Sequence, residues 1–411
     1  MALQNPVIVI HYHELWLKGG NRRFFLGKLI TAVQRALEGV PIERMLQPSD
    51  RILLELGAGA DLAEAAERLR RVFGIAYFGV ARRVARDVEV IAGAAWEEVS
   101  AERFATFAVR AKRSDKSFAV RTADLERKVG AHLLAELRAA GRDVRVHLDD
   151  PELTCRIEIT ANEAIVYARK IPGAGGLPPN TAGRLMCLLS GGFDSAVAAW
   201  QMMKRGAHLS FAHFFGTGAR PGESSMHVAR ELARKLTPYQ FTARLNLVPF
   251  ETIQREIVRA APESYRVLLY RRMMLRIAEQ LARRDRALGL VTGDSLGQVA
   301  SQTLHNLAAV GAAARLPLYR PLVGTDKQEI LALARQIGTY EISAEPFHDC
   351  CPVFLPRAPA LHAKVEELDQ AEASVDVAAL VRQGVEAATL ERFRYSAGRV
   401  EQVESFRPAT A

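Results

Sequence analysis

The sequence is poor in cysteine, and none of its cysteines has the spacing typical of metal ligands. Four cysteines in 411 residues are too few and too irregularly placed for a disulfide framework. No two of them form a CxxC pair, so we expect no structural zinc or iron–sulfur site and no protein-bound metal centre. Reduced cysteines fit a cytoplasmic setting, which is the localisation that we expect.

The chain also lacks long apolar segments. Residues 7–10 are apolar but end at His11, which makes them too short for the core of a signal peptide. No apolar run is long enough to cross a bilayer, so we expect no membrane partner. Aromatic residues make up 7% of the chain, and no basic segment carries an aromatic platform on which single-stranded bases would stack.

The remaining composition is that of a basic globular protein. Apolar residues make up 49% and charged residues 25%, and the length suits two or three domains. The net charge of +9 and a sequence pI of about 9.5 favour a polyanionic partner such as nucleic acid. The alternative is a cytosolic enzyme that is basic without binding a polyanion.

The most informative segment is a short apolar run followed by a glycine turn. Residues 185–189 predict a buried strand, residues 190–192 a turn, and residues 193–200 the start of a helix. Glycines let the backbone approach a ligand closely, and the free N–H groups of a helix start attract phosphate. We expect Asp194 and Ser195 to cap this helix. A plain strand-to-helix turn is the alternative, but the complete string SGGFDS resembles the PP-loop of ATP pyrophosphatases.

The rest of the second half alternates between predicted strands and helices. This order predicts a doubly wound parallel sheet, in which ligands bind outside the carboxyl ends of the strands. Three loops should therefore meet at one edge, namely residues 190–195, 213–216 and 293–298. The further strands are expected at residues 208–215, 241–249 and 287–292, and the helices at residues 223–236, 252–284 with a break near Pro262, and 326–337.

The first half predicts two smaller α+β units. Strand and helix signals at residues 7–12, 23–37, 51–56 and 62–72 suggest a ferredoxin-like unit. Strands near residues 107–110, 144–148, 155–160 and 164–168 and a helix at 122–139 repeat the pattern. We interpret the basic run Arg110, Lys112, Arg113 and Lys116 as contacts to a phosphate backbone, a solvated surface being the alternative.

Glycine and proline cluster at residues 170–179 and predict a linker into the second half. We expect an amino-terminal ferredoxin-like domain at residues 1–60, an RNA-binding domain at 61–172, a nucleotide domain at 173–360 and a helical extension at 361–411. The extension has helical patterns at residues 361–371 and 375–390, ends in a polar tail and shows no chemistry.

Two adjacent cysteines, Cys350 and Cys351, follow the predicted sheet. Thiolates are the reactive form of cysteine, and positive charge nearby, for example on His348, lowers the pKa of a thiol. Neighbouring cysteines rarely bridge each other without strain, which favours a reactive thiol here over two small buried side chains. Cys155 and Cys187 lie in predicted strands, where core packing is the expected role.

Motifs along almost the whole chain, up to about Pro359, resemble those of the ThiI-type tRNA 4-thiouridine synthases in their short form. They lie in the family's order. The motifs are the start His13-Glu14-Leu15-Trp16-Leu17-Lys18-Gly19-Gly20-Asn21-Arg22, then Arg113-Ser114-Asp115-Lys116-Ser117-Phe118, Gly173-Ala174-Gly175-Gly176-Leu177-Pro178, the PP-loop, Arg271-Arg272-Met273-Met274, Gly297-Gln298-Val299-Ala300-Ser301-Gln302-Thr303 and Arg320-Pro321-Leu322.

This resemblance implies a ferredoxin-like domain, a THUMP domain that binds the tRNA acceptor end, and a PP-loop domain. It also implies that ATP and Mg²⁺ serve to adenylate O4 of a tRNA uridine, normally at position 8, before persulfide sulfur displaces AMP. The sulfur would come from a cysteine desulfurase or a separate persulfide carrier, because no cysteine follows Cys351 to suggest the rhodanese domain of the long form. We further expect a homodimer. Some relatives also supply sulfur for thiamine biosynthesis.

By matching motifs, the resemblance assigns roles to individual residues. Cys351 and Asp194 would be catalytic, with Cys350 or Cys187 as a possible second thiol. Lys18 and Arg22 would join the basic run in binding RNA. The residues implied for ATP binding are Leu188, Leu189, Ser190, Gly191, Gly192, Asp194, Ser195, His213, Phe214, Arg271, Gly293 and Gln302.

The chain departs from the family pattern at a few positions. Asn180 stands where a glycine is expected, and Asp294 where a glutamate is expected. The residues His11-Tyr12-His13 are also unusual, because in the family a glycine usually precedes the position of Glu14. Two alternative functions remain open: a PP-loop enzyme that modifies tRNA with an amine nucleophile, and a non-catalytic RNA-binding protein with a vestigial nucleotide loop.

Overall fold

The computed structural model describes residues 7–12, 14–47, 51–216, 225–346 and 358–406. Two compact units are formed. The amino-terminal unit contains residues 1–23 and 39–176, and the carboxyl-terminal unit contains residues 24–38 and 177–411. Helix α1 (Arg22–Ala36) therefore belongs mostly to the carboxyl-terminal unit. No helix of the described ranges is long and apolar enough to span a membrane.

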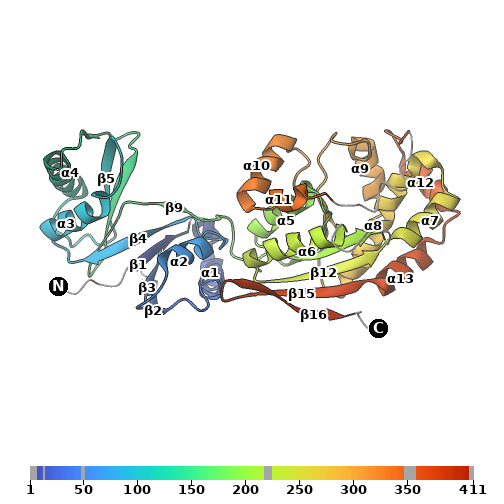
Figure 1. Ribbon diagram of the computed structural model, residues 1–411, viewed down its shortest axis with the longest axis horizontal. Helices are drawn as coiled ribbons and strands as arrows, with labels where there is room; N and C mark the ends of the chain where they lie inside the picture. Colours follow the sequence, from blue (N-terminus) through green and yellow to red (C-terminus); the bar gives the residue numbers. More distant parts are fainter. Residues whose placement is uncertain (1–6, 13, 48–50, 217–224, 347–357, 407–411) are drawn as a thin grey trace. The chain divides into compact units, whose positions relative to one another are not determined.

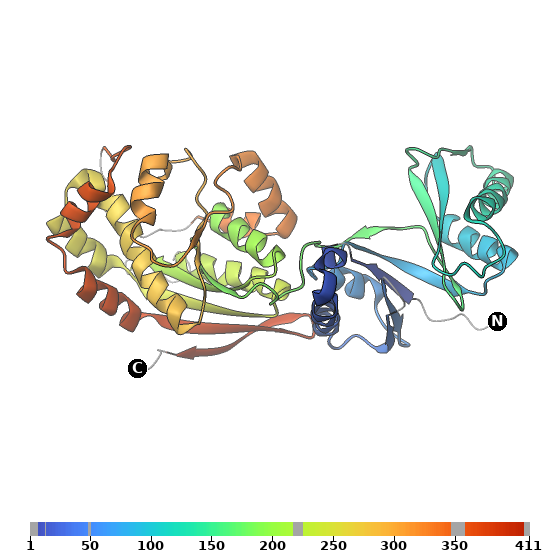
Figure 2. The same ribbon diagram turned by 180° about the vertical axis from the view of Figure 1, so that it is seen from behind.

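One mixed sheet runs through the amino-terminal unit (Figures 1 and 2). Strand β4 pairs with β1 over its first five residues and with β8 over its last three, so β4 joins two halves of the sheet. The order is β2-β3-β1-β4-β8-β7-β5-β6, with β9 paired to β4. The strands are β1 (Val7–His11), β2 (Ile42–Leu46), β3 (Arg51–Leu56), β4 (Tyr77–Val84), β5 (Thr106–Arg113), β6 (Arg145–Val146), β7 (Leu153–Ile159), β8 (Ala164–Tyr167) and β9 (Ile171–Pro172).

Two helices of this unit begin where an aspartate side chain satisfies free backbone N–H groups. Asp61 accepts hydrogen bonds from Ala63 N and Glu64 N at the start of α2 (Leu62–Leu69), and Asp87 caps α3 (Val88–Val99) in the same way. Helix α4 (Thr122–Ala139) has the bounds that the apolar periodicity predicts. A short 3₁₀ segment, η1 (Glu14–Asn21), follows β1. Together α3 and α4 enclose an apolar core with β5, β7 and β8.

The carboxyl-terminal unit contains a second sheet, of order β14-β13-β10-β11-β12-β15-β16 (Figure 1). Its first five strands are parallel, which confirms the doubly wound α/β fold. They are β10 (Arg184–Leu188), β11 (His208–Phe215), β12 (Thr242–Pro249), β13 (Leu290–Val291) and β14 (Leu318–Tyr319). Strands β10 and β13 are neighbours although about a hundred residues separate them, and this crossover sets the position of the site.

Helices cover both faces of this sheet. Met186 packs with the apolar side chains of α8, whereas the next residue, Cys187, contacts the first turn of α5. Successive strand residues point to opposite faces, so α5 and α8 lie on opposite sides of β10. Helix α5 contacts α6, α10 and α11, and α8 contacts α7, α9, α12 and α13. The helices are α5 (Phe193–Lys204), α6 (Ser225–Leu236), α7 (Glu251–Ala260), α8 (Arg266–Arg284), α9 (Leu304–Gly311), α10 (Lys327–Ile337), α11 (Tyr340–Ala344), α12 (Val365–Glu372) and α13 (Val377–Ala387), with 3₁₀ turns η2 (Thr237–Tyr239), η3 (Glu263–Tyr265) and η4 (Ala300–Gln302).

The two helices expected in the extension are present as α12 and α13, but the polar tail expected after them is wrong. After α12 and α13 the chain forms an antiparallel hairpin, β15 (Thr389–Ser396) and β16 (Arg399–Phe406). Strand β15 pairs antiparallel with β12 and widens the parallel sheet. The alternation of Phe393 and Tyr395, both buried, with arginines was a period-two strand signal that the polar composition concealed.

Asn180 adopts a backbone conformation that explains the departure from glycine. Its φ is 62°, in the left-handed region that glycine adopts at little cost and that asparagine tolerates better than most other residues. The substitution therefore keeps the turn that leads into β10.

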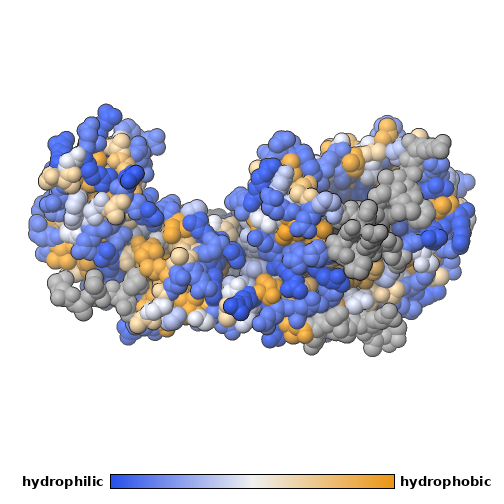
Figure 3. All heavy atoms as spheres, in the orientation of Figure 1, coloured by the Kyte–Doolittle hydropathy of each residue, from blue (hydrophilic) through white to orange (hydrophobic). Residues whose placement is uncertain are grey.

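On the face drawn in Figure 3, hydrophobic residues form small groups scattered among hydrophilic ones.

Candidate active site at the carboxyl edge of the parallel sheet

A cavity of about 290 Å³ opens where β10 and β13 end. Its lining combines an apolar part, which includes Tyr270, Met274 and Leu318, with a polar part, which includes Ser190 and Asp194. Predominantly apolar walls with a few converging polar groups are typical of small-molecule sites. The position is the one that a doubly wound parallel sheet favours for a ligand.

The glycine turn is held in one conformation by its two serines. The Ser190 and Ser195 hydroxyls are 3.0 Å apart, and Ser195 Oγ also accepts a hydrogen bond of 3.0 Å from Ser190 N. Gly192 N donates to Ser190 Oγ over 3.2 Å. Ser195 is buried, so these bonds fix the shape of the turn before any ligand binds.

Helix α5 begins without a side-chain cap, contrary to the expectation that Asp194 and Ser195 would cap it. The N-cap residue is Gly192, and among the described residues this helix start has no side-chain cap hydrogen bond. The first N–H groups of α5 therefore remain available to an anion at the positive end of the helix dipole. Gly293 packs against this turn so closely that a Cβ atom would lie 2.6 Å from Ser195 N. Only glycine fits at this approach of β13 to the helix.

A buried carboxylate, Asp294, is the electrostatic centre of the cavity wall. It forms ion pairs with Arg271 and, over 3.2 Å, with Arg320, and Thr292 Oγ1 donates to its Oδ2 over 2.8 Å. Burial by itself would raise the pKa of Asp294, but Arg271, Thr292 and Arg320 outweigh burial and hold the pKa below its usual value. Asp294 is thus ionised near neutral pH and orients both arginines at the edge of the cavity.

Asp194 has a different partner, which the sequence analysis missed. Lys327 Nζ lies 2.7 Å from Asp194 Oδ1, and Gln298 Nε2 donates to Oδ2 over 3.0 Å. Lys327 is the first residue of α10 and also lies 5.4 Å from the centre of the Phe193 ring. These contacts bring a cation from a segment about 130 residues distant to the start of α5. The capping residue Asp326, which placed the helix start, was the available signal.

Arg271 and Arg272 are adjacent but have different functions. Arg271 lines the cavity and donates to Ser301 O over 2.9 Å. Arg272 is buried, donates to Ala309 O over 2.9 Å and forms ion pairs on α12, including one of 2.9 Å with Glu372. Neighbouring helix residues are about 100° apart, so one side chain reaches the cavity while the other fastens α12 to α8.

Seven of the twelve residues implied for ATP binding line this cavity, and five do not. His213 is buried and bridges Leu189 O and Ser225 Oγ at 2.9 and 3.0 Å. Phe214 packs edge-on against Phe250, with ring centres 5.4 Å apart. The loop at residues 213–216 therefore does not join the other two at the cavity. The lining residues are Leu188, Ser190, Asp194, Ser195, Arg271, Gly293 and Gln302, and the others are Leu189, Gly191, Gly192, His213 and Phe214.

The described cysteines are poorly suited to nucleophilic chemistry. Cys155 and Cys187 are fully buried, and burial is the main cause that raises the pKa of each thiol to about 12. The Cys187 thiol donates to Ser195 O over 3.8 Å, which makes it part of the packing below the turn. This geometry disfavours Cys187 as a second thiol. Cys350 and Cys351 lie outside the described residues.

Four of the six basic residues predicted to bind RNA lie in the amino-terminal unit, on or just after β5. Arg110 and Lys112 alternate along β5 with exposed side chains, and Lys116 is also exposed in the loop that follows. Arg113 instead holds that loop, because it donates to Val120 O over 2.6 Å. Arg22 is half-buried at the start of α1, and the side chain of Lys18 lies outside the described set. The structure thus leaves a basic face on the outer half of β5.

We predict that Asp294→Asn destabilises the fold by about 3–5 kcal/mol, because it leaves two arginines without their shared carboxylate. The folded pKa of Asp294 lies below the unfolded value, so its contribution is present above the unfolded pKa and is lost as pH falls through the folded pKa. The difference in unfolding free energy between the two proteins should be constant near neutral pH and shrink in acid. Denaturant unfolding at several pH values measures it; a difference that persists unchanged at the lowest pH would contradict the assignment.

Sequence profiles of three domains match the chain. The thiamine biosynthesis protein (ThiI) profile matches residues 180–377, the ThiI ferredoxin-like domain residues 7–79, and the THUMP domain residues 87–169. The ferredoxin-like match extends past the boundary expected at residue 60, and it includes the segment up to Gly79 of β4, which pairs with β1.

Relatives and solved structures resemble the chain over most of its length. A probable tRNA sulfurtransferase from Thermus thermophilus is 42% identical over 371 residues, covering 90% of each chain. Its counterpart from Geobacillus kaustophilus is 40% identical and covers 92% of this chain and 93% of that one. A 4-thiouridine synthetase crystallised with RNA and ATP matches with a TM-score of 0.83 and 30% identity over 97% of this chain and all of that one. PH1313 from Pyrococcus horikoshii, at 24% identity and a TM-score of 0.60, shares the fold.

Proposed function

The chain belongs to the ThiI family of tRNA sulfurtransferases, and from that premise we propose that it uses ATP to replace O4 of a tRNA uridine with sulfur, giving 4-thiouridine. The observation that carries the proposal is the cavity at the end of β10, in which an apolar wall adjoins an uncapped helix start. We expect position 8 of tRNA as the target.

ATP fits the residues of the cavity. The apolar part of the lining suits an adenine ring, and the turn at residues 190–192 with the start of α5 suits the phosphates. Mg²⁺ usually binds through one or two carboxylates and the phosphates of a substrate. Asp194, at the helix start, is a carboxylate suited to such an ion, which would neutralise phosphate charge.

The groups around the turn are suited to an adenylation step. An oxygen on uracil is a poor leaving group, so O4 must first attack the α-phosphate of ATP and release pyrophosphate. Negative charge then develops on the departing phosphates, and preorganised donors stabilise it. The first N–H groups of α5 and the Lys327 ammonium are the donors that this chain supplies. Arg271 and Arg320 also line the cavity, where their ion pairs with Asp294 fix their orientation.

Sulfur transfer requires a thiol outside the described residues, and we propose Cys351. The terminal sulfur of a persulfide attacks C4 of the adenylated uracil, and AMP leaves with the C–O bond electrons. A second thiolate then attacks the other sulfur, which leaves sulfur on the base and a disulfide in the protein. Cys351 would carry the persulfide or resolve it, with Cys350 as a candidate second thiol.

The partners follow from these steps. tRNA would bind the basic face on β5, which includes Arg110 and Lys112. A cysteine desulfurase, or a separate persulfide carrier, would supply the sulfur. We propose a homodimer in the cytoplasm as the working form.

Reconstitution tests the proposal directly. Purified protein, tRNA, ATP, Mg²⁺ and a desulfurase with cysteine should yield 4-thiouridine, measured by mass spectrometry of digested nucleosides. Omission of ATP should abolish the product. AMP formation with a nitrogen-containing product would favour the amine-nucleophile alternative, and no tRNA-dependent AMP formation would favour the non-catalytic RNA-binding protein.

A further inference from the structure

A groove of about 990 Å³ lies between the second half of α8 and α13, and residues after α9 line part of it. In Figures 1 and 2, α13 lies beside α8 on the same side of the parallel sheet. This α8–α13 groove is more than three times as large as the candidate active site, and the two share no lining residue. Its volume is at the upper end of the range for small-molecule sites, which suits a larger occupant.

A row of valines on α13 gives the groove an apolar part. Val377, Val381 and Val385 are four residues apart, so they lie on the same side of the helix. Val385 is buried, but Val377 and Val381 remain partly exposed where they pack against the core. The apolar side of α13 is therefore covered only in part by the protein itself.

The groove is also lined by arginines from three separate segments. They are Arg276, Arg283 and Arg284 on α8, Arg315 after α9, and Arg382 on α13. Arginine side chains around an apolar strip form a surface with a hydrophobic centre and a charged margin. This is the usual arrangement of a surface that binds another protein.

Two of these arginines are neutralised within the chain. Glu372 accepts a hydrogen bond of 2.7 Å from each terminal nitrogen of Arg276. Glu279 forms an ion pair of 2.6 Å with Arg283, and its second oxygen accepts from the backbone N–H of Arg315 over 2.7 Å. The carboxylates of Glu279 and Glu372 are thus already occupied.

The other three arginines have exposed side chains that face the groove without such partners. In the part of the chain that the structure describes, no ion pair or side-chain hydrogen bond joins Arg284, Arg315 or Arg382 to a carboxylate. Glu386, one turn after Arg382, is the remaining glutamate of the lining and is exposed. It offsets one of the three charges, so the groove keeps a positive excess.

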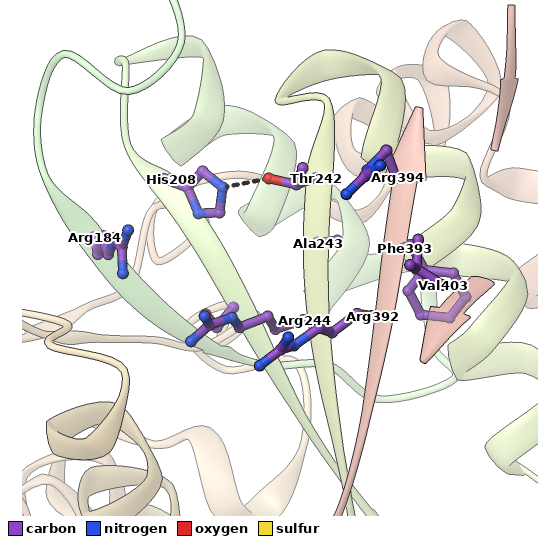
Figure 4. Close-up of a pocket in the computed structure, with 10 residues that line it drawn as sticks. Arg184, His208, Thr242, Ala243, Arg244, Arg392, Phe393, Arg394 and Val403 are labelled. Atoms are coloured by element: carbon purple, nitrogen blue, oxygen red, sulfur yellow. Dashed lines mark hydrogen bonds between the residues drawn. The ribbon is translucent and has the colours of Figure 1, made fainter. Parts of the chain in front are cut away.

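The arginines of a smaller cavity differ in this respect. Figure 4 shows that cavity, of about 260 Å³, at the amino ends of β10, β11 and β12, where Arg244 and Arg392 lie next to each other. Arg244 forms an ion pair of 2.6 Å with Asp285. The register of β15 and β16 sets Glu401 opposite Arg394. Acidic residues of the chain itself therefore offset the positive charge at that cavity.

We propose that the α8–α13 groove binds an acidic amphipathic helix of a partner protein. Apolar side chains spaced by three and four residues along that helix pack on the valine row, as in other helix-in-groove complexes. Glutamate or aspartate side chains beside them pair with Arg284, Arg315 and Arg382, because the guanidinium fork matches a carboxylate. A phosphate backbone has no apolar side with which to cover the valines. The proposal does not depend on the thiolation activity.

A synthetic peptide provides the probe. It has about 16 residues, with leucines at helical spacing on one side and glutamates on the other, and carries a fluorescent label. Anisotropy titration with the full-length protein should show saturable binding that weakens as salt is raised. A peptide of the same composition in scrambled order, and one with lysine in place of glutamate, should not bind.

Charge removal at the groove is compared with matched removal elsewhere. Arg284→Gln/Arg382→Gln should weaken peptide binding about tenfold, since two ion pairs at the margin of an interface are lost. The control is Arg255→Gln/Arg259→Gln on α7, where each arginine is exposed and paired with a glutamate of its own helix. It should bind the peptide like the wild type. Circular dichroism and thermal melting select variants that remain folded.

A second variant tests the apolar part without changing charge. Val381→Thr keeps the shape of the side chain but places a hydroxyl on the valine row, and it should weaken peptide binding about threefold or more. Binding of labelled tRNA should be the same for the wild type and all of these variants, because the groove is assigned to a protein helix.

The outcomes can reject the site. The proposal is overturned if the amphipathic peptide shows no saturable binding, if its scrambled form binds equally well, or if a folded Arg284→Gln/Arg382→Gln variant keeps full affinity. A lower tRNA affinity and salt slope in that variant, with peptide binding unchanged, would assign the groove to RNA instead. The titration needs neither ATP nor sulfur transfer, so failure of the proposed function would not affect its result.

Discussion

Cys351→Ser is expected to reduce thiolation to the background of the assay while tRNA-dependent release of pyrophosphate continues. A serine hydroxyl neither carries a persulfide nor attacks one. The adenylation site that we propose, at residues 190–195, does not include Cys351. Adenylation should therefore continue in this variant and release one pyrophosphate for each bound tRNA, as a single burst. Quantitative nucleoside mass spectrometry and a pyrophosphate assay on the same samples measure both steps.

The buried thiols explain why this effect should be large. At a pKa of about 12, Cys155 and Cys187 have a thiolate fraction of about 10⁻⁵ at pH 7, so neither can replace an accessible thiol. Cys155→Ala is the matched control and should retain thiolation in a folded protein. Cys350→Ser shows whether the neighbouring thiol resolves the persulfide. Full thiolation by the Cys351→Ser variant would contradict the proposed role of Cys351 in sulfur transfer.

Lys327→Met should slow adenylation by about 10²–10³-fold, the range typical of losing one preorganised charge at a developing anion. The ammonium lies 2.7 Å from Asp194 Oδ1 at the start of α5, so it is held next to the turn before substrate binds. Lys327→Arg should recover part of the rate because it keeps the charge. The burst rate of pyrophosphate release under single-turnover conditions reports this step.

A lysine on the PP-loop helix provides the control for this prediction. Lys204 is the last residue of α5, and its Nζ lies 5.0 Å from the Trp200 ring, at the far end of the helix from the turn. Lys204→Met removes the same charge and should leave the burst rate close to that of the wild type. Equal rates for Lys327→Met and the wild type would show that α10 takes no part in adenylation.

Local patterns in the sequence predicted much of the carboxyl-terminal fold. The strand at residues 208–215 and the start of the doubly wound sheet follow from apolar runs of the right length. The break of the long helix near Pro262 also appears, between α7 and α8. These features depend on neighbouring residues, so the order of side chains along the chain is sufficient to predict them.

The site was predicted less completely, because its residues come together through crossovers. The string SGGFDS predicted the turn, but not that Gly192 would be the N-cap and that Asp194 would pair with Lys327. Periodicity on a helix cannot say which of two adjacent arginines faces a cavity, since both fit an amphipathic pattern. Packing of α12 against α8 decides that Arg272 is buried and Arg271 is not.

The sequence by itself determined the glycine turn, the parallel sheet and the buried strand that carries Cys187. Only the tertiary structure decided that Asp294 unites Arg271 with Arg320 and that β15 joins β12. The reason is physical. Elements form from interactions between near neighbours, whereas charges at a site add up through space, between residues that strand order and register bring together.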